Sequence, residues 1–211
     1  MSVPTGSEAL TKARKEEIVN ACAALYETMG FREITLNAIG KQTSFTRTSI
    51  YNYFHTKEEI FLALLQREHE AWIADMRGIF AGPAMPASAF AEAFAHALEG
   101  RGCMLKLMSM NLYEMEGNSR MENLVAFKRV YAAALEALRQ CLRRFFPAMT
   151  EADLLEFRYA FFPFLFGVYP YTNATEKQKA AMALAAVEVP SCTIYSITKS
   201  LTEKLLRPFE R

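Results

Sequence analysis

The polar side chains that follow Phe45 have the types that read DNA bases. On a helix with about 100° per residue, Thr48, Asn52 and His55 would fall on one outer side, with Tyr51 flanking it and Arg47 long enough to reach it. In the major groove an arginine can pair with guanine, an asparagine with adenine, and a threonine methyl group can contact the thymine methyl. The alternative is an ordinary solvated face on a cluster of helices. The side-chain types favour contact with the bases of double-stranded DNA.

Two short helices joined by a tight turn would present this set. Thr35 is predicted to cap the first helix, which ends near Thr43, because its side-chain oxygen can accept from N–H groups of the first turn. Thr46 is predicted to cap the second helix, and Phe45 and Ile50 can form a hydrophobic staple across it. The staple would fix the angle at which the second helix begins. This arrangement is typical of a helix-turn-helix.

A third helix is expected directly after this pair. Thr56, with Glu59 three residues later, has the sequence pattern of a capping box. Ile50, Tyr53 and Phe54 fall on the inner side of the second helix, where they can pack against its neighbours. The sequence therefore predicts a three-helix head with one polar outer face.

The stretch from Thr35 to Ile60 resembles the N-terminal signature of TetR/AcrR-type transcriptional regulators. The signature has a threonine, an apolar residue and an isoleucine before a turn, and then an ending similar to Tyr-x-Tyr-Phe-x-x-Lys-Glu-x-Leu. The matching positions are Thr35, Leu36, Ile39, the turn 43–46, Tyr51, Tyr53, Phe54, Lys57, Glu58 and Ile60. Ser44 and Thr48 stand where glycine is common. We therefore expect a strained positive φ at Ser44 and an additional side chain facing DNA at Thr48.

The resemblance indicates how the head would hold DNA. Base edges would be reached by Arg47, Thr48, Tyr51 and Asn52, with Asn37 as a helper from the preceding helix. Phosphates would be held by Thr35, Thr46, Tyr53 and Lys57. Lys57 would also lie at a helix N-terminus, where backbone N–H groups point outward.

Composition indicates a globular protein whose positive charge is local. The chain has 211 residues, 52% of them hydrophobic, and a net charge of +1. That is ample for a buried core and gives no overall attraction to nucleic acid. Residues 12–57 carry seven basic and four acidic side chains, a modest excess that supports DNA binding weakly.

The cysteines and histidines do not form a reactive site or a metal site in the sequence. Cys22, Cys103, Cys141 and Cys192 are far apart, without a Cys-x-x-Cys pattern or a histidine at ligand spacing. His96 and Cys103 lack a third orienting group. We therefore expect no metal, no cofactor and no enzyme activity, with Cys22 packed in the core. Without a signal pattern or an apolar run of about 18 residues, a soluble cytoplasmic protein without a membrane partner is expected.

The rest of the chain also has helical patterns, which predicts an all-α fold. The expected helices span about Ala9–Met29, Lys57–Arg77, Ser88–Gly100, Cys103–Glu116, Ser119–Phe146, a segment from Thr150, Thr175–Val187 and a last helix from Pro190. Ser119 with Glu122 and Thr150 with Asp153 supply start signals. Pro163 is expected to kink the helix that contains it.

Two domains are expected: a helix-turn-helix DNA-binding domain of residues 1–56 and a helical domain of residues 57–211. The resemblance implies that the second domain binds a small-molecule effector and forms a homodimer through helices near 151–168 and 191–207. Methionine and aromatic side chains could line a cavity for an apolar ligand. The candidates are Met104, Met108, Tyr113, Phe127, Tyr131, Phe162, Phe166 and Tyr169. Plain filling of the core is the alternative.

The sequence thus predicts a ligand-responsive transcriptional regulator. We expect a repressor that binds a near-palindromic operator as a homodimer and is released by a small, largely apolar effector. Two alternatives stay open. One is a thiol-responsive regulator that uses Cys103, Cys141 or Cys192. The other is a small-molecule-binding protein or enzyme with a non-regulatory helix-turn-helix.

Overall fold

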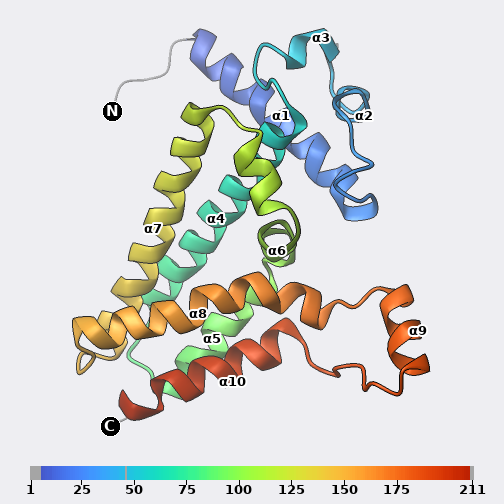
Figure 1. The fold of residues 1–211 in the computed structure, drawn as a ribbon. Coiled ribbons are helices and arrows are strands. Elements are labelled where there is room, and N and C mark those ends of the chain that lie inside the picture. The colour runs from blue at the N-terminus through green and yellow to red at the C-terminus, as the bar shows by residue number, and fades with distance from the viewer. Residues whose placement is uncertain (1–5, 46, 210–211) are drawn as a thin grey trace. The chain divides into compact units, whose positions relative to one another are not determined.

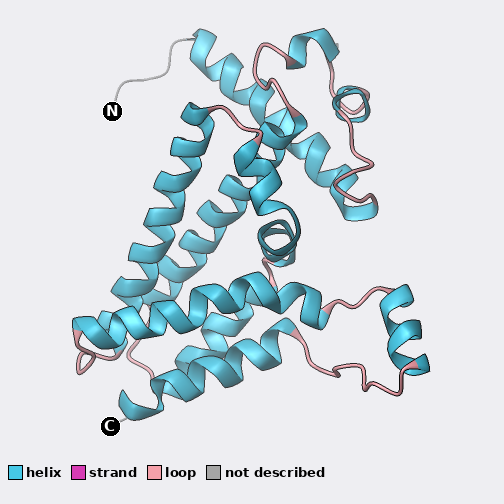
Figure 2. Cartoon of the chain, viewed as in Figure 1, coloured by secondary structure: helices cyan, strands magenta, loops and turns pink. Residues whose placement is uncertain are grey.

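The computed structural model of the chain describes residues 6–45 and 47–209. Within these ranges the regular elements are helices and no strand is present (Figure 2), which confirms the all-α prediction. The elements (Figure 1) are α1 (Gly6–Thr28), α2 (Leu36–Gly40), α3 (Arg47–Ile50), α4 (Lys57–Ala81), α5 (Ala87–Glu99), α6 (Gly102–Gly117), α7 (Met121–Phe145), α8 (Glu151–Thr172), α9 (Glu176–Leu184), α10 (Ile194–Leu206) and a 3-10 turn (Arg207–Phe209).

The chain forms two compact units, and each unit is built from two separate stretches of the sequence. The first unit comprises Met1–Arg67 and Asn111–Lys128, and the second comprises Glu68–Met110 and Arg129–Arg211. The divisions between them fall within α4, α6 and α7. The predicted domain boundary, between residues 56 and 57, lies at the N-terminal end of α4.

The core of the first unit forms on the inner face of α1. Ile18 and Cys22 are fully buried there, as expected for apolar residues on one helical stripe. The Phe61 ring packs against Tyr26 and Phe31, with ring centroids 5.2 and 4.5 Å apart. The prediction that Cys22 is a core residue is confirmed.

A buried carboxylate, that of Glu59, ties α4 to the segment between α6 and α7. Glu59 is 1% exposed. Its Oε1 accepts from Arg120 Nε at 2.6 Å and from the Arg120 backbone N–H at 3.0 Å. Its Oε2 accepts from Arg120 Nη2 at 3.0 Å and from the His55 backbone N–H at 2.8 Å. Arg120 Nη2 also donates to the Tyr53 carbonyl at 3.3 Å, so one arginine holds both the carboxylate and the turn before α4.

These hydrogen bonds set the ionisation of Glu59. Burial raises its pKa, but the hydrogen bonds from Arg120 and from the His55 and Arg120 backbone N–H groups outweigh it and lower the pKa from 4.5 to about 2. The predicted capping box is therefore only half correct. Thr56 Oγ1 does accept from the Glu59 N–H at 3.2 Å, but the Glu59 carboxylate turns to His55 and Arg120.

The second unit contains α5 and α10 packed along each other, with α8 also in contact with α10 (Figure 1). Aromatic rings fill its core: Phe94 lies 5.7 Å from Phe90 and 5.0 Å from Phe161 between ring centroids. Trp72 is fully buried, and its ring lies 6.1 Å from Phe94. The aromatic richness of α8 therefore serves partly to fill this core.

Several helix starts follow the sequence signals. Thr150 and Asp153 form a complete capping box at the start of α8, and Thr175 opens α9 in the same way. Because each cap joins groups three residues apart, the local sequence contains all that the bond needs. Helix α8 continues through Pro163 and Pro170.

Other predicted helix ends are wrong. The Ser119 hydroxyl donates to the Met115 carbonyl at 2.7 Å, so it completes the end of α6 and does not cap α7. The last helix begins at Ile194, because Thr193 and Ser196 form its capping box, and not near Pro190. The helix α4 passes through Gly78 and ends at Ala81, since an isolated glycine costs a helix only about 1 kcal/mol.

The buried pair of Glu59 and Arg120 should contribute strongly to stability. Replacing Arg120 by Ala is expected to lower the free energy of unfolding by about 3 kcal/mol, because it leaves a buried carboxylate without its main partner. Urea unfolding followed by circular dichroism measures the change. Arg139→Ala is a matched control, since Arg139 also binds two carboxylates but is 44% exposed, and should cost less than about 1 kcal/mol. Equal losses in the two variants would contradict the special role of Glu59.

Stability should also depend on acid through Glu59. Its folded pKa of about 2 lies below the ordinary 4.5, so its contribution is complete above pH 4.5 and is lost as the pH falls toward 2. The difference in unfolding free energy between the wild type and Glu59→Gln should therefore shrink over this interval. Denaturant titrations at several pH values measure it, and a difference independent of pH would refute the assignment.

Candidate nucleic-acid interface and effector site

The first helix of the predicted helix-turn-helix is short and well capped. Thr35 Oγ1 accepts from the Ala38 N–H at 3.1 Å, which confirms Thr35 as the N-cap of α2. The helix ends at Gly40, with Lys41 as its C-cap, which is earlier than the predicted end near Thr43. Asn37 is exposed on its surface, so it is available to an external partner.

A carboxylate from α1 organises the turn after α2. The Ser44 backbone N–H donates to Glu17 Oε1 at 2.5 Å, and Ser44 Oγ donates to Glu17 Oε2 at 3.1 Å. Thr43 Oγ1 lies within hydrogen-bond distance of the Gly40 and Phe45 carbonyl oxygens, at 2.9 and 3.1 Å. The expected positive φ at Ser44 is wrong: among the described non-glycine residues, only Ala186 has one. The turn is held by side-chain hydrogen bonds, so it does not need the left-handed conformation.

The predicted reading helix is shorter in the structure than in the sequence analysis. The α-helix covers Arg47–Ile50, and the next three residues form turns. The Asn52 N–H donates to the Ser49 carbonyl at 3.2 Å and the Tyr53 N–H to the Ile50 carbonyl at 2.8 Å, which are tighter bonds of the 3-10 type. Thr46 lies outside the described residues, as does the side chain of Arg47. The predicted helical face therefore consists of one helical turn followed by a tight turn.

The described members of the predicted base-reading set face solvent. Thr48 and Asn52 are exposed, and Tyr51 is 42% exposed. Ile50 and Phe54 are buried at 0% and 4% exposure, which confirms their inward prediction. A surface that carries hydroxyl and amide groups on a rigidly packed base can present hydrogen bonds to base edges.

The predicted phosphate contacts also have structural partners. Tyr53 is half-buried, with its ring centroid 6.4 Å from that of Phe45. The Lys57 ammonium donates to the Phe31 carbonyl at 2.8 Å and lies 4.5 Å from the centroid of the Phe31 ring. An ammonium group has three donors, so this contact positions Lys57 and leaves further donors. The phosphate roles of Thr35, Tyr53 and Lys57 stay predictions.

The eight predicted effector-binding residues lie in different surroundings. Met104, Met108, Phe127 and Phe162 are buried, Tyr131 and Tyr169 are half-buried, and Phe166 and Tyr113 are exposed at 36% and 93%. Tyr131 and Phe162 are in edge contact, with ring centroids 5.7 Å apart. Burial raises the pKa of the Tyr169 hydroxyl. Phe127 and Tyr113 belong to the first unit and the other six to the second.

Tyr113 differs most from its predicted role. At 93% exposure it cannot line an enclosed cavity. The inward face of α6 instead carries Met104, Leu107 and Met108, and Tyr113 falls outside it. Whether a methionine or aromatic residue on α6 faces inward depends on how the helix is rotated in the fold.

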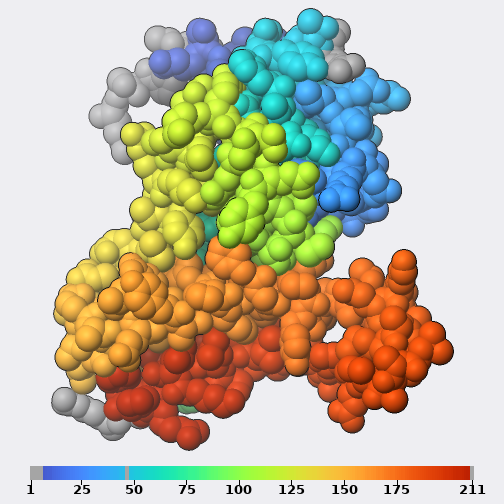
Figure 3. All heavy atoms as spheres, viewed as in Figure 1, coloured from blue at the N-terminus to red at the C-terminus, as the bar shows by residue number. Residues whose placement is uncertain are grey.

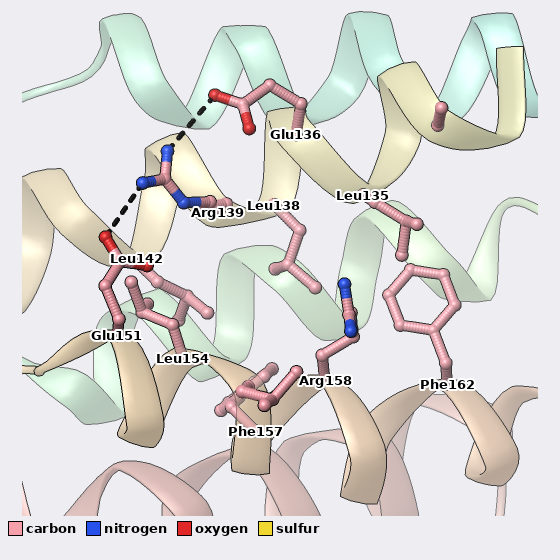
Figure 4. Close-up of a pocket in the computed structure, with 12 residues that line it drawn as sticks. Leu135, Glu136, Leu138, Arg139, Leu142, Glu151, Leu154, Phe157, Arg158 and Phe162 are labelled. Carbon is pink, nitrogen blue, oxygen red and sulfur yellow. Dashed lines mark hydrogen bonds and ion pairs between the residues drawn. The ribbon is translucent and has the colours of Figure 1, made fainter. Parts of the chain in front are cut away.

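The structure has a cavity between α7 and α8 that the sequence analysis missed (Figure 4). Its volume is about 390 Å³. It is lined by Ala132, Leu135, Glu136, Leu138, Arg139, Leu142, Glu151, Leu154, Leu155, Phe157, Arg158 and Phe162. Only Phe162 had been predicted as an effector contact. The sequence offered an amphipathic stripe on α7 and an aromatic run in α8, but no signal that these two helices would enclose a cavity.

The comparisons with known proteins define the class of this protein. Residues 18–64 match the model of bacterial regulatory proteins of the tetR family. Residues 66–201 match the model of the tetracyclin repressor-like C-terminal domain. With the helix-turn-helix and the all-α second unit, these matches show a DNA-binding transcriptional regulator. The chain belongs to the TetR family. No curated protein matches it.

Solved structures share the fold at low identity. A putative TetR-family regulator from Mesorhizobium loti has a TM-score of 0.62 at 13% identity, over 95% of this chain and 98% of that one. The fatty acid degradation regulator FadR from Bacillus halodurans has a TM-score of 0.60 at 16% identity, over 92% and 94%. FadR from Bacillus subtilis, solved with stearoyl-CoA, has a TM-score of 0.59 at 16% identity, over 90% and 96%. Within the described residues, no helix is long and apolar enough to cross a membrane.

The predicted base contacts of Arg47 and Asn52 can be distinguished by experiment from phosphate contacts. Replacing either residue by Ala should weaken binding by about 1–3 kcal/mol at one base position of the operator. Fluorescence anisotropy on an operator and its single-base variants measures this. Asn173→Ala, at the C-cap of α8, is the matched control and should leave all affinities unchanged. An equal loss on every sequence would instead identify a phosphate contact.

Proposed function

We propose that this TetR-family regulator is a homodimeric repressor that binds a near-palindromic operator and leaves it when a small, largely apolar effector binds the second unit. The main supporting observation is the solvent-facing set of Thr48, Tyr51 and Asn52 beside the buried Ile50 and Phe54. A polar surface on such a packed base suits the major groove. Its natural place is the cytoplasm, where the operator is accessible.

An apolar groove on α8 and α10 supports dimer formation. It has a volume of about 460 Å³ and is lined by Phe164, Gly167, Val168, Tyr171, Ile197, Ser200, Leu201 and Lys204. Ile197 and Leu201 are half-exposed, whereas Thr198 and Thr202 are buried. The core therefore leaves Ile197 and Leu201 partly uncovered. An isologous contact of this face with its copy would cover it.

The segment between α8 and α10 gives further support. No residue of α9 is buried, and Leu184, Val187 and Val189 are 91%, 53% and 40% exposed. Figure 3 shows α9 as a lobe beyond the ends of α8 and α10. Isolated helices shorter than about 12–15 residues are marginal in water. Contact with a second copy would supply the burial that this segment lacks.

The two-fold symmetry of the dimer would determine the spacing and orientation of the half-sites in the operator. Two copies would present their helix-turn-helix motifs about 34–36 Å apart, one turn of DNA, and would require similar half-sites in opposite orientation. An effector can release such a dimer only if it binds the DNA-free conformation more tightly. Effector binding and operator affinity must therefore change together.

An apolar effector suits the lining of the second unit. Its aromatic and methionine side chains are adaptable and apolar, and the Bacillus subtilis FadR structure with stearoyl-CoA is a relative in fold whose ligand carries a long acyl chain. The thiol-responsive alternative is weakened for Cys141. Burial raises its pKa to about 11, and its Sγ lies 3.2 Å from the Met76 carbonyl oxygen, so a reactive thiolate is disfavoured.

Selection of bound sequences from random DNA tests the proposed function directly. The expected result is a near-palindromic site with half-sites one turn apart. Affinity for that site should fall steeply with salt and should fall again when an effector is added. A protein that recovers no sequence, or that turns over its ligand, would not be a repressor. Replacing Cys103 and Cys192 by Ser should leave the effector response intact, which separates it from a thiol response.

The dimer face can be tested at a glycine of its groove. Gly167 and Gly78 are both helical, and a Cβ at either would meet nothing within 4 Å. Gly167→Glu should weaken dimerisation at least about tenfold, because it would place a carboxylate in an apolar contact twice. Gly78→Glu is the matched control and should not change it. Sedimentation equilibrium measures both, and identical dimer constants would remove the groove from the interface.

A further inference from the structure

The cavity between α7 and α8 has an apolar floor of the size that small molecules fill. Leu138, Phe157 and Phe162 are at most 5% exposed, and with Leu142 and Leu154 they line a space of about 390 Å³. Small-molecule sites span roughly 300–1,000 Å³ and combine apolar walls with a few polar groups. The space lies entirely within the second unit.

Most charges on the rim of this cavity are already paired. Arg139 binds Glu136 at 3.5 Å and Glu151 at 2.9 Å, and Figure 4 shows both contacts as dashed lines. Arg143 also pairs with Glu151. These groups neutralise one another, so they add little attraction for a ligand of either sign.

Arg158 is the exception on this rim. Within the part of the chain that the structure describes, no carboxylate pairs with its guanidinium, whose near contact is the Tyr159 ring at 5.2 Å from its centroid. Figure 4 shows the guanidinium directed toward α7, between Leu138 and Phe162. Arg158 is half-buried. A guanidinium in this position offers two parallel N–H donors above an apolar floor.

We propose that this cavity binds a small organic carboxylate with an apolar body. The carboxylate pairs with Arg158, and the body lies on Leu138, Leu142 and Phe157. Carboxylates match the planar fork of a guanidinium, whereas a cation would be repelled by it and a neutral molecule would leave it unpaired. Binding itself is independent of the proposed function; only the statement that this ligand is the effector rests on it.

The chain carries its own reporter of binding. Trp72 is the only tryptophan of the sequence, and its ring centroid lies 6.3 Å from that of Phe162, which lines the cavity. A ligand that contacts Phe162 should therefore change the fluorescence of Trp72. Calorimetry on the same samples gives the affinity without relying on this reporter.

The test compares octanoate with octanamide and octylammonium, which have the same total number of carbon atoms and differ in charge. The full-length wild type should bind octanoate about tenfold more tightly than octanamide, and octylammonium more weakly still. Arg158→Gln should bring octanoate to the affinity of octanamide, and Arg158→Lys should give an intermediate value. Arg129→Gln, which removes an exposed arginine of α7 outside the cavity, should not change any of them. Circular dichroism confirms that each variant is folded.

Several outcomes would overturn the proposal: no octanoate binding, equal affinity for octanoate and octanamide, or unchanged octanoate affinity in folded Arg158→Gln. Operator release by octanoate is measured separately. Binding that depends on Arg158 but leaves operator affinity unchanged would keep the site and reject its role as the effector site. If other ligands release the operator but octanoate does not bind, the proposed carboxylate site is rejected and the proposed repressor function stands.

Discussion

The first unit depends on one buried carboxylate, because Glu59 cannot stay ionised in the interior without the donors around it. Arg120 supplies three of these donors and also holds the Tyr53 carbonyl. A single hydrogen-bonded centre thereby joins the turn of residues 51–53, the start of α4 and the segment after α6. Breaking these hydrogen bonds would leave the buried Glu59 carboxylate without partners in a medium of low polarity. The three segments must therefore keep their arrangement while the unit is folded.

This centre has a functional consequence. The exposed residues Thr48, Tyr51 and Asn52 lie in α3 and in the tight turn after it, and a short element of this kind has little stability of its own. The buried side chains of Ile50 and Phe54 anchor this element in the core, and Arg120 donates to the Tyr53 carbonyl. Since Arg120 stands between α6 and α7, the segment 111–128 belongs physically to the DNA-binding unit although it lies far along the chain. A displacement of this segment would therefore act on the turn of residues 51–53 directly, through the hydrogen bond from Arg120 to the Tyr53 carbonyl, and not through α2.

Helix α8 has three surfaces with different surroundings, and its sequence alone does not distinguish them. Phe157 and Phe161 fill the core, Arg158 and Leu154 border the cavity with α7, and Gly167 and Phe164 border the groove with α10. Because the helix is apolar on nearly all sides, its sequence predicts burial but cannot say against what. The structure places a different feature on each side: the core, the cavity with α7 and the groove with α10.

The sequence by itself determined those features that depend on residues within one helical turn. The caps at Thr35, Thr150 and Thr175, the buried stripe of α1 and the exposed set from Thr48 to Asn52 all follow from periodicity and from bonds over three residues. The tertiary structure alone decided the partner of Glu59, 61 positions away, the early end of α3, the outward position of Tyr113 and the meeting of Arg158 with the leucines of α7. These features depend on how the helices rotate and pack against one another. Many rotations satisfy the same local sequence pattern, and burial and charge pairing across the fold select one of them.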